Sequence, residues 1–357
     1  MIQDLFRGRF VRGLFPFIAL ALSFLVCGVM LFCFGIDPIK TYVSIFSHAF
    51  GSLNGVSETT GAAIPMTIVA AGIIFVKRVG VFNLGAEGQV LLGALGAQIL
   101  ASQCAGLAAP LALLVTILGG MVFGALWALI PALLRVTLKV NEIVVCIMLN
   151  QIALYFIGYL VRGPLKDPRD FNAQSVVIPP GVRMPQFVPD TKIHAGLVLA
   201  LFLIVAVSLL LKYTTYGYRV RVVGSSERTA VYAGIPAGLT VLSAFLIGGA
   251  ASGLAGANEV MGVAHRLQGT ISNNYGFVGL TVAMIAKNNL FILIAVSVLY
   301  SALQVGGLVI QITQHVPMEL ANIIQAVTVL FVLSADFLYE KTAASYPKKN
   351  ALKEVEA

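Results

Sequence analysis

Asparagine, glutamate and glutamine side chains stand at the start of one apolar segment, where their amide and carboxyl groups could form hydrogen bonds. The sequence VFNLGAEGQVLLG places Asn83, Glu87 and Gln89 among three glycines, and the apolar run continues to Leu100. An ionised carboxylate near the centre of a bilayer costs about 2.5–3.5 kcal/mol, so it should face protein, water or a partner rather than lipid. Glycine allows close backbone approach and weakens a helix locally, as is expected where non-helical backbone lines a cavity.

The composition explains why a membrane is the appropriate setting for this segment. The chain is 59% hydrophobic and 11% charged, whereas soluble domains carry about 25% charged residues. Because each span needs about 20 residues, we expect an all-α, polytopic membrane protein with about ten transmembrane helices; one helix fewer plus a re-entrant segment is the alternative. The predicted spans are 14–36, 60–76, 82–102, 108–134, 142–161, 194–211, 239–258, 274–286, 289–311 and 317–339.

A second glycine-interrupted segment with a polar start lies in the other half of the chain. The sequence NNYGFVGLTVAMIA begins at Asn273, and Asn258 and Glu259 precede it. This segment and the one at Asn83 are entered from opposite sides of the predicted membrane. Such a pair predicts an inverted repeat with broken or half helices and a pathway near the bilayer midplane. Coincidence in a glycine-rich membrane protein is the alternative.

The basic residues are distributed unevenly between the two sides of the predicted membrane. Most of the 23 lysines and arginines lie on the inner side if the N-terminus is cytoplasmic. The positive-inside rule therefore predicts that both termini are cytoplasmic. This asymmetry explains the net charge of +8 without nucleic-acid binding. The four cysteines lack paired spacing, which indicates packing residues rather than disulfides or a metal site.

The stretch YTTYGYRVRVVGSSERTAVYAGIPAG has the character of a folded cytoplasmic segment between two spans. Ser225 or Ser226 can cap a short helix over residues 227–233, with Gly234 as its stop. The helix could dock into a groove on a soluble partner, or the stretch could be a solvated loop that anchors the topology. Its basic residues are Arg219, Arg221 and Arg228.

The longest predicted extracytoplasmic loop covers residues 162–193 and contains six prolines. Proline limits the conformations that a loop loses on ordering. We expect this loop to contact a substrate-binding protein, the alternative being an unengaged lid or spacer. The basic residues predicted to take part in docking are Arg162, Lys166 and Arg169 in the loop, with His265 and Arg266 at the outer mouth.

Three motifs in order carry a family resemblance that covers nearly the whole chain. They are FNLGAEGQVLLGA, GYRVRVVGSSERTAVYAGI and GLAGANEVMGVAHRLQGTISNNYGFVGLTVAMIAKNN. Together they resemble permease subunits of bacterial ABC importers in the branched-chain amino acid and ribose permease superfamily. The chain looks closest to the branch that works with basic-membrane-protein-type binding proteins and imports nucleosides.

The resemblance implies that residues 217–234 form the coupling segment, which inserts into a cleft on the ATP-binding subunit. No GxxxxGK[ST] phosphate loop occurs in the chain, so ATP and Mg would be bound by that separate subunit and this chain would be no enzyme and bind no cofactor. The coupling residues implied are Gly217, Arg219, Arg221, Gly224, Glu227, Arg228, Ala230, Tyr232 and Gly234.

Nucleosides are neutral and offer hydroxyl groups and base edges, so a pathway for them needs amide and carboxyl groups and aromatic faces. Glu87 and Glu259 have an alternative role, which is to satisfy loose backbone amides of a broken helix. Ribose-like sugars or riboflavin are alternative solutes, and an ion-coupled secondary transporter is the alternative class. The predicted pathway residues are Asn83, Glu87, Gln89, Asn258, Glu259, Asn273, Asn274, Tyr275 and Phe277.

The resemblance also implies partners and a location. We expect a multi-pass protein of the bacterial inner membrane that works with an ATP-binding subunit, an extracytoplasmic binding protein and a second permease, which is a related shorter chain or a second copy. The expected parts of this single transmembrane domain are 1–58 (first helix and outer loop), 59–161 (first repeat), 162–193 (outer loop), 194–211 (linking helix), 212–237 (coupling segment), 238–340 (second repeat) and 341–357 (cytoplasmic tail).

Overall fold

The protein is described by a computed structural model that covers residues 9–104, 106–286 and 289–314, with isolated positions from 320 to 334. This part of the chain is helical and contains no strand beyond three isolated bridges. The helices are α2 (Arg9–Cys33), α3 (Pro38–Phe50), α4 (Leu53–Lys77), α5 (Ala86–Gln103), α6 (Ala109–Leu138), α7 (Glu142–Arg162), η1 (Pro180–Val182), α8 (Gly196–Tyr213), α9 (Thr215–Ser225), α10 (Glu227–Tyr232), α11 (Ala237–Glu259), η2 (Val260–Ala264), α12 (Tyr275–Ile285) and α13 (Leu290–Gln314).

The predicted all-α class is confirmed, and the described helices include 6 that are long and apolar enough to cross a membrane. The bent pair Ala21–Cys33 and Pro38–Phe50, with 119° between its parts, would be a seventh. Neither α5 nor the 11-residue α12 is among them. The predicted span 317–339 lies largely outside the described residues. The count of about ten spans and the inverted repeat therefore stay predictions.

The chain divides into two compact units, residues 1–52 with 302–357 and residues 53–301. In the first unit the polypeptide reverses between α2 and α3. Asp37 caps α3 by accepting hydrogen bonds from the amides of Ile39 and Lys40, and Pro38 stands at the first helical position. The Tyr42 hydroxyl donates to the Phe24 carbonyl at 2.6 Å, which fixes α3 against α2.

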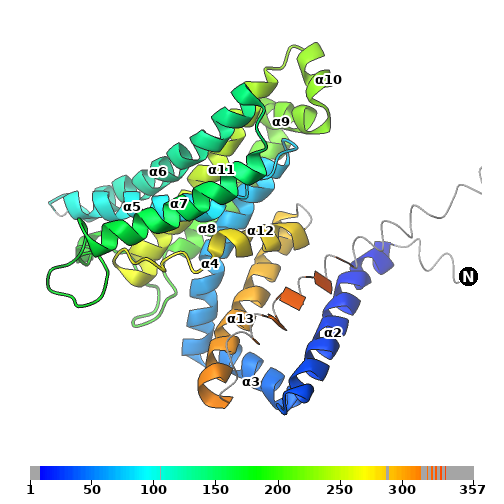
Figure 1. Ribbon diagram of the computed structural model, residues 1–357, viewed down its shortest axis with the longest axis vertical. Coiled ribbons are helices and arrows are strands. Elements are labelled where there is room, and N and C mark those ends of the chain that lie inside the picture. The colour runs from blue at the N-terminus through cyan, green and yellow to red at the C-terminus, as the bar shows by residue number, and fades with distance from the viewer. Residues whose placement is uncertain are drawn as a thin grey trace, which may run out of the picture. The chain divides into compact units, whose positions relative to one another are not determined.

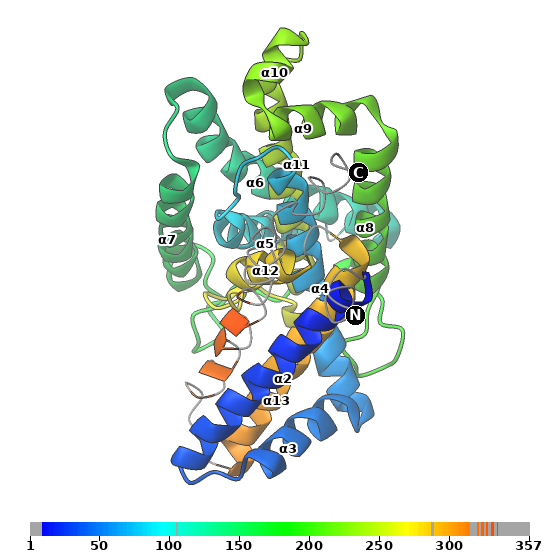
Figure 2. The same ribbon diagram turned by 90° about the vertical axis from the view of Figure 1, so that its right-hand side faces the viewer.

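The second unit is built around α4 and α11, on which α5, α6, α8 and α12 pack (Figure 1). In the most apolar 18-residue stretch of α4, 89% is buried inside the protein, whereas in that of α7 only 22% is buried. Figure 2 shows α7 and α8 at opposite edges of this unit, with α4 and α11 between them. The apolar outer faces of α7 and α8 are therefore the surfaces available to lipid or to a second membrane subunit.

Close backbone contact joins the inner helices of the second unit. A Cβ atom at Gly93 on α5 would overlap the backbone of Gly253 on α11, and a Cβ atom at Gly253 would overlap the backbone of Gly120 on α6, so both positions need glycine. Gly124 on α6 meets the same part of α11. Small residues allow helices to approach closely where lipid provides no hydrophobic driving force between them. The close approach expected for the glycines of the Asn83 segment is thus confirmed at Gly93.

Candidate functional site

The polar residues that precede and begin α5 form a closed set of hydrogen bonds. The side-chain amides of Asn83 and Gln89 bond to each other in both directions, each at 2.9 Å. Asn83 also accepts the amide hydrogen of Gly85 at 3.2 Å. Both side chains are fully buried. Their hydrogen-bonding capacity therefore stabilises the non-helical entry into α5.

Asn150 on α7 completes the same set from a distant part of the chain. Its Oδ1 accepts from the amide of Gly88 at 2.9 Å, and its Nδ2 donates to the carbonyl of Leu84 at 2.8 Å. These backbone groups belong to the turn and first residues of α5, where a helix leaves groups without intrahelical partners. Sequence reasoning missed Asn150, and its only signal was a pair of amides, Asn150 and Gln151, inside an apolar span.

Glu87 joins the beginning of α5 to the beginning of α12. Its carboxyl group accepts the hydroxyl hydrogen of Ser272 and the amide hydrogen of Gly276, the latter at 2.8 Å. The side chain is buried, and Gly276 lies so close that a Cβ there would overlap the Glu87 backbone. This geometry favours the alternative that Glu87 satisfies loose groups of a broken helix. Contact between solute and Glu87 stays a prediction.

Asn258 and Glu259 behave differently, because they retain hydrogen-bonding atoms without partners. Both atoms of the Asn258 amide and Oε1 of Glu259 are buried and unpaired among the described residues. The two residues precede η2, a π-helical turn; such turns are rare and are frequent at functional sites. Of the predicted pathway residues in the described part of the chain, these two have the clearest unused polar capacity.

The remaining predicted pathway residues surround the start of α12. Tyr275 is buried, whereas Asn273, Asn274 and Phe277 are exposed. Asn273 and Asn274 both adopt positive φ, at 42° and 60°, in the turn that leads into the helix. Asparagine tolerates this conformation better than most residues. The predicted pathway residues fall into one group at the start of α5 and another around η2 and the start of α12. A hydrogen bond from the amide of Gly276 to Glu87 joins the start of α5 to the start of α12.

The predicted cytoplasmic helix exists and is preceded by a second one that the sequence did not indicate. The Ser226 side chain caps α10 by accepting the amide hydrogen of Thr229 at 3.2 Å, and Gly234 follows the helix with φ of 72°. The preceding helix, α9, is capped by Thr214, which accepts from the amide of Gly217 at 3.0 Å. Both caps use a hydroxyl group to satisfy a free helix amide.

The residues of this coupling segment divide into an inner and an outer set. Gly217 and Ala230 are buried, and Gly224 lies against the backbone of Arg78. Glu227 forms an ion pair with Lys139 at 3.6 Å. A cavity of about 220 Å³ separates this part of the segment from the ends of α6 and α11. Among the exposed members, the large side chains available to a partner are Arg219, Arg221, Arg228 and Tyr232, the last 92% exposed.

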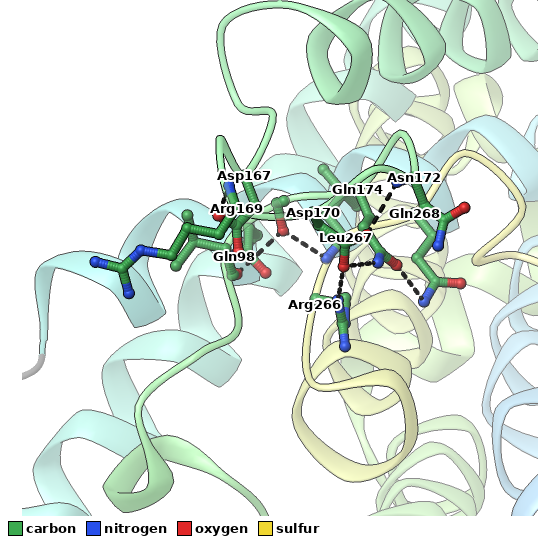
Figure 3. A network of polar contacts seen from close by, with 11 residues as sticks. Gln98, Asp167, Arg169, Asp170, Asn172, Gln174, Arg266, Leu267 and Gln268 are labelled. Carbon is green, nitrogen blue, oxygen red and sulfur yellow. Dashed lines mark hydrogen bonds and ion pairs between the residues drawn. The ribbon is translucent and has the colours of Figure 1, made fainter.

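The loop after α7 is an ordered cover at the opposite end of the second unit (Figures 1 and 3). Its backbone bonds onto the chain that follows α11: the amide of Ser175 donates to Leu267 at 2.9 Å, that of Ile178 to His265 at 2.8 Å, and that of Met184 to Met261 at 2.9 Å. Gln98 on α5 donates to the carbonyl of Val176 at 2.9 Å. The loop is therefore folded, whether or not a partner engages it.

The basic residues predicted to dock a partner have different environments. Arg266 donates to Asp170 in an ion pair of 2.9 Å, as Figure 3 shows, so its charge is already used within the chain. His265 is half-buried, and burial with the nearby charge of Arg183 lowers its pKa. Arg162, Lys166 and Arg169 are exposed. These three loop residues remain the available docking charges.

His194, at the end of the same loop, is fully buried. Its Nδ1 accepts the amide hydrogen of Gly196 at 3.0 Å, so the proton of the neutral ring lies on Nε2, which has no partner among the described residues. Burial, followed by the charge of His265, lowers the pKa of His194 to about 4. The ring is therefore neutral at physiological pH.

Comparison with known proteins identifies the family. Residues 55–333 match the family described as "Branched-chain amino acid transport system / permease component". The chain belongs to this permease family. A glucose ABC transporter permease of Haloferax volcanii is 31% identical over 90% of this chain and 87% of its own length. A nucleoside ABC transporter permease of Lactococcus lactis is 28% identical over 97% and 96%, and a guanosine ABC transporter permease of Bacillus subtilis is 30% identical over 92% and 94%. No solved structure matches the chain significantly.

The family resemblance expected from the three motifs is thus confirmed. The chain is a multi-pass ABC transporter permease, and its relatives are permease subunits of ABC transporters. The match covers all of the second unit but its first two residues, including the coupling segment and the ordered loop.

Proposed function

We propose that this permease imports nucleosides across the inner membrane, with ATP hydrolysed by a separate subunit and solute delivered by an extracytoplasmic binding protein. The observation that carries the proposal is the placement of two partner-facing surfaces at opposite ends of the second unit. One is the exposed face of α9 and α10, and the other is the ordered loop after α7 (Figure 1). An importer needs partners on both sides of the membrane, whereas a carrier that works alone needs neither.

Support for the solute comes from the relatives and from the chemistry of the buried polar groups. Two of the similar permeases are described as nucleoside and guanosine transporters. Amide and carboxyl groups such as those of Asn258 and Glu259 suit a neutral solute with hydroxyl groups and base edges. Glucose, the solute of another relative, shares the hydroxyl groups of a nucleoside but lacks a base. A further relative is described as a probable riboflavin import permease. Ribose-like sugars and riboflavin are the competing solutes.

The mechanism that we propose uses the coupling segment as the receiver of ATPase motion. ATP binding closes the partner subunits on α9 and α10, and the permease halves rock to expose the solute alternately to each side. Two permease subunits are required, and we propose a related shorter chain as the second, with a second copy as the alternative. In this arrangement both termini are cytoplasmic, about ten segments enter the membrane, and the two glycine-interrupted segments form the inverted repeat.

The test combines replacement of the coupling segment with a point variant at an exposed residue, which should not affect folding. Replacing residues 217–234 with a flexible linker should abolish ATP-dependent uptake while the spans remain inserted. Tyr232→Ala should weaken capture of the ATP-binding subunit by about 30-fold or more, because exposed tyrosines that become buried are common interface anchors. Tyr155→Ala is the matched control, since Tyr155 is 74% exposed on α7, away from the coupling segment.

Uptake of labelled uridine by vesicles that contain the whole transporter tests which solute it carries. Competition by unlabelled nucleosides, with none from glucose or riboflavin, is the expected result. Normal uptake by the linker variant would refute the coupling assignment, and competition by glucose alone would refute the nucleoside assignment.

A further inference from the structure

Phe171 is 100% exposed, although the loop that carries it is ordered. It lies in the tip formed by residues 168–173, beyond the antiparallel bridge between Lys166 and Ser175. A phenylalanine side chain has a large apolar surface whose exposure to water is unfavourable. A single exposed apolar residue is ordinary on a protein surface. This ring is distinguished by its full exposure on a turn that several hydrogen bonds hold.

The turn is held by side chains that bond to their own backbone. The Asp167 carboxylate accepts from the amide of Arg169 at 2.9 Å, and the Asp170 carboxylate accepts from the amide of Asn172 at 2.9 Å. Asp170 also receives the side chains of Arg266 and Gln174. The bond from the Asn172 amide is the main cause of the lowered pKa of Asp170, which therefore remains ionised. Phe171 is thus fixed in an outward position from both sides.

The acidic and the basic side chains in and beside the tip differ in their partners. Asp167 and Asp170 are occupied by backbone amides and by Arg266, as Figure 3 shows for the network at the base of the turn. Lys166 and Arg169 are exposed and form no ion pair with any residue that the structure describes. In Figure 3 the Arg169 side chain extends away from this network. The tip therefore presents an aromatic ring near the exposed basic side chains of Lys166 and Arg169.

We propose that Phe171 is the anchor by which this loop docks the extracytoplasmic binding protein, with its ring in an apolar pocket and Arg169 against acidic residues at the rim. The proposal rests on the proposed function, which supplies the class of partner. Aromatic and arginine side chains dominate the binding energy of protein interfaces, and a preorganised turn reduces the entropy lost on association. Arg266 holds the turn in place and does not face the partner.

A protein partner explains the rigid presentation better than a lipid surface does. Binding at a lipid interface requires only apolar burial and positive charge, with no fixed orientation of the side chain. Here two carboxylates, an arginine and a glutamine together fix one turn that projects one ring. That arrangement suits a partner with a shaped pocket.

The experiment uses the complete transporter in lipid nanodiscs with its ATP-binding subunits and the binding protein that purifies with it. ATP hydrolysis is measured as the binding-protein concentration is increased. For Phe171→Ala, the concentration that gives half-maximal stimulation should rise about 30-fold or more, since loss of an anchor weakens binding by at least this factor. The maximal rate and the rate without binding protein should not change. Phe171→Trp should restore tight docking, and Arg169→Glu should weaken docking most at low salt.

Phe187→Ala is the matched control, because Phe187 is 55% exposed on the same loop but outside the tip. An unchanged curve for Phe171→Ala, or an equal shift for Phe187→Ala, overturns the anchor and leaves the proposed function standing. An effect of Phe171→Ala that depends on anionic lipid and occurs without binding protein also overturns it, in favour of a lipid contact. A wild-type transporter that no binding protein stimulates overturns both proposals.

Discussion

The bond set around Glu87 leads to a prediction that separates a structural role from a solute-binding role. The Glu87 carboxyl group accepts hydrogens from Ser272 and from the amide of Gly276, and the side chain is 6% exposed. Glu87→Gln keeps one acceptor oxygen and replaces the other with an NH₂ donor. One of the two buried donors then lacks a partner, which costs about 1–3 kcal/mol.

The assay is thermal unfolding in detergent, read together with uptake. Glu87→Gln should lower the melting temperature by a few degrees. Ser272→Ala should have a smaller effect, because it removes one donor and leaves the Glu87 carboxyl group with its bond from the Gly276 amide. The double variant should be less destabilised than the sum of the two, since the residues share one interaction. Uptake per folded transporter, measured well below the melting temperature, should stay near the wild-type value.

The reverse pattern would refute this reasoning. If Glu87→Gln left the melting temperature unchanged but raised the KM for nucleoside uptake, the carboxyl group would contact solute. Gln98→Ala is a useful comparison, because Gln98 lies further along the same helix and bonds to the ordered loop at Val176. Its loss should lower stability without affecting the link to α12.

Two further predictions concern the ends of the second unit. The pKa of His194 is lowered to about 4 in the folded protein, from 6.5. Protonation in the unfolded state should therefore remove stability as pH falls from about 6.5 towards 4, by about 1.4 kcal/mol per pH unit. Melting temperatures from pH 7 to pH 5 measure this, and a slope that is no smaller in His194→Gln than in the wild type would contradict it. Ser226→Ala removes the cap of α10 and should cost about 1 kcal/mol locally. Faster hydrogen exchange confined to residues 227–232 is the expected readout, and unchanged exchange there would count against the cap.

The sequence predicted the helices well where an apolar run or a local cap defines them. Each predicted apolar span up to residue 311 coincides with a described helix, and Ser226 caps α10 with Gly234 beyond it. Helix α3 was missed because its 13 residues are too short and too polar to form a predicted span, although Asp37 and Pro38 form an ordinary helix start. Helix α9 was missed because its glycine and arginines resemble a loop.

The site was harder to predict, because its contacts join residues that are far apart in the chain. Asn83, Glu87 and Gln89 were correctly identified as unusual in a membrane segment. Asn150, which bonds to the backbone of Leu84 and Gly88, and Ser272, which bonds to Glu87, could not be assigned these contacts from local sequence, since their partners are distant in the chain. Periodicity and composition report what a residue is, and the hydrogen-bond partner depends on how the helices pack.

The bonds that fasten the loop onto η2 have a thermodynamic consequence. Helix α11 begins at Ala237, close after α10, and its last residue, Glu259, leads directly into η2. The amide of Met184 in the loop bonds to Met261 in η2. If displacement of α11 at one end alters its contacts at the other end, the two surfaces are energetically coupled. Linkage is reciprocal, so if ATPase binding at α10 changes the affinity of the loop for its partner by a given factor, that partner changes the affinity of α10 for the ATPase by the same factor. Docking of the binding protein and binding of the ATPase would then share one coupling free energy.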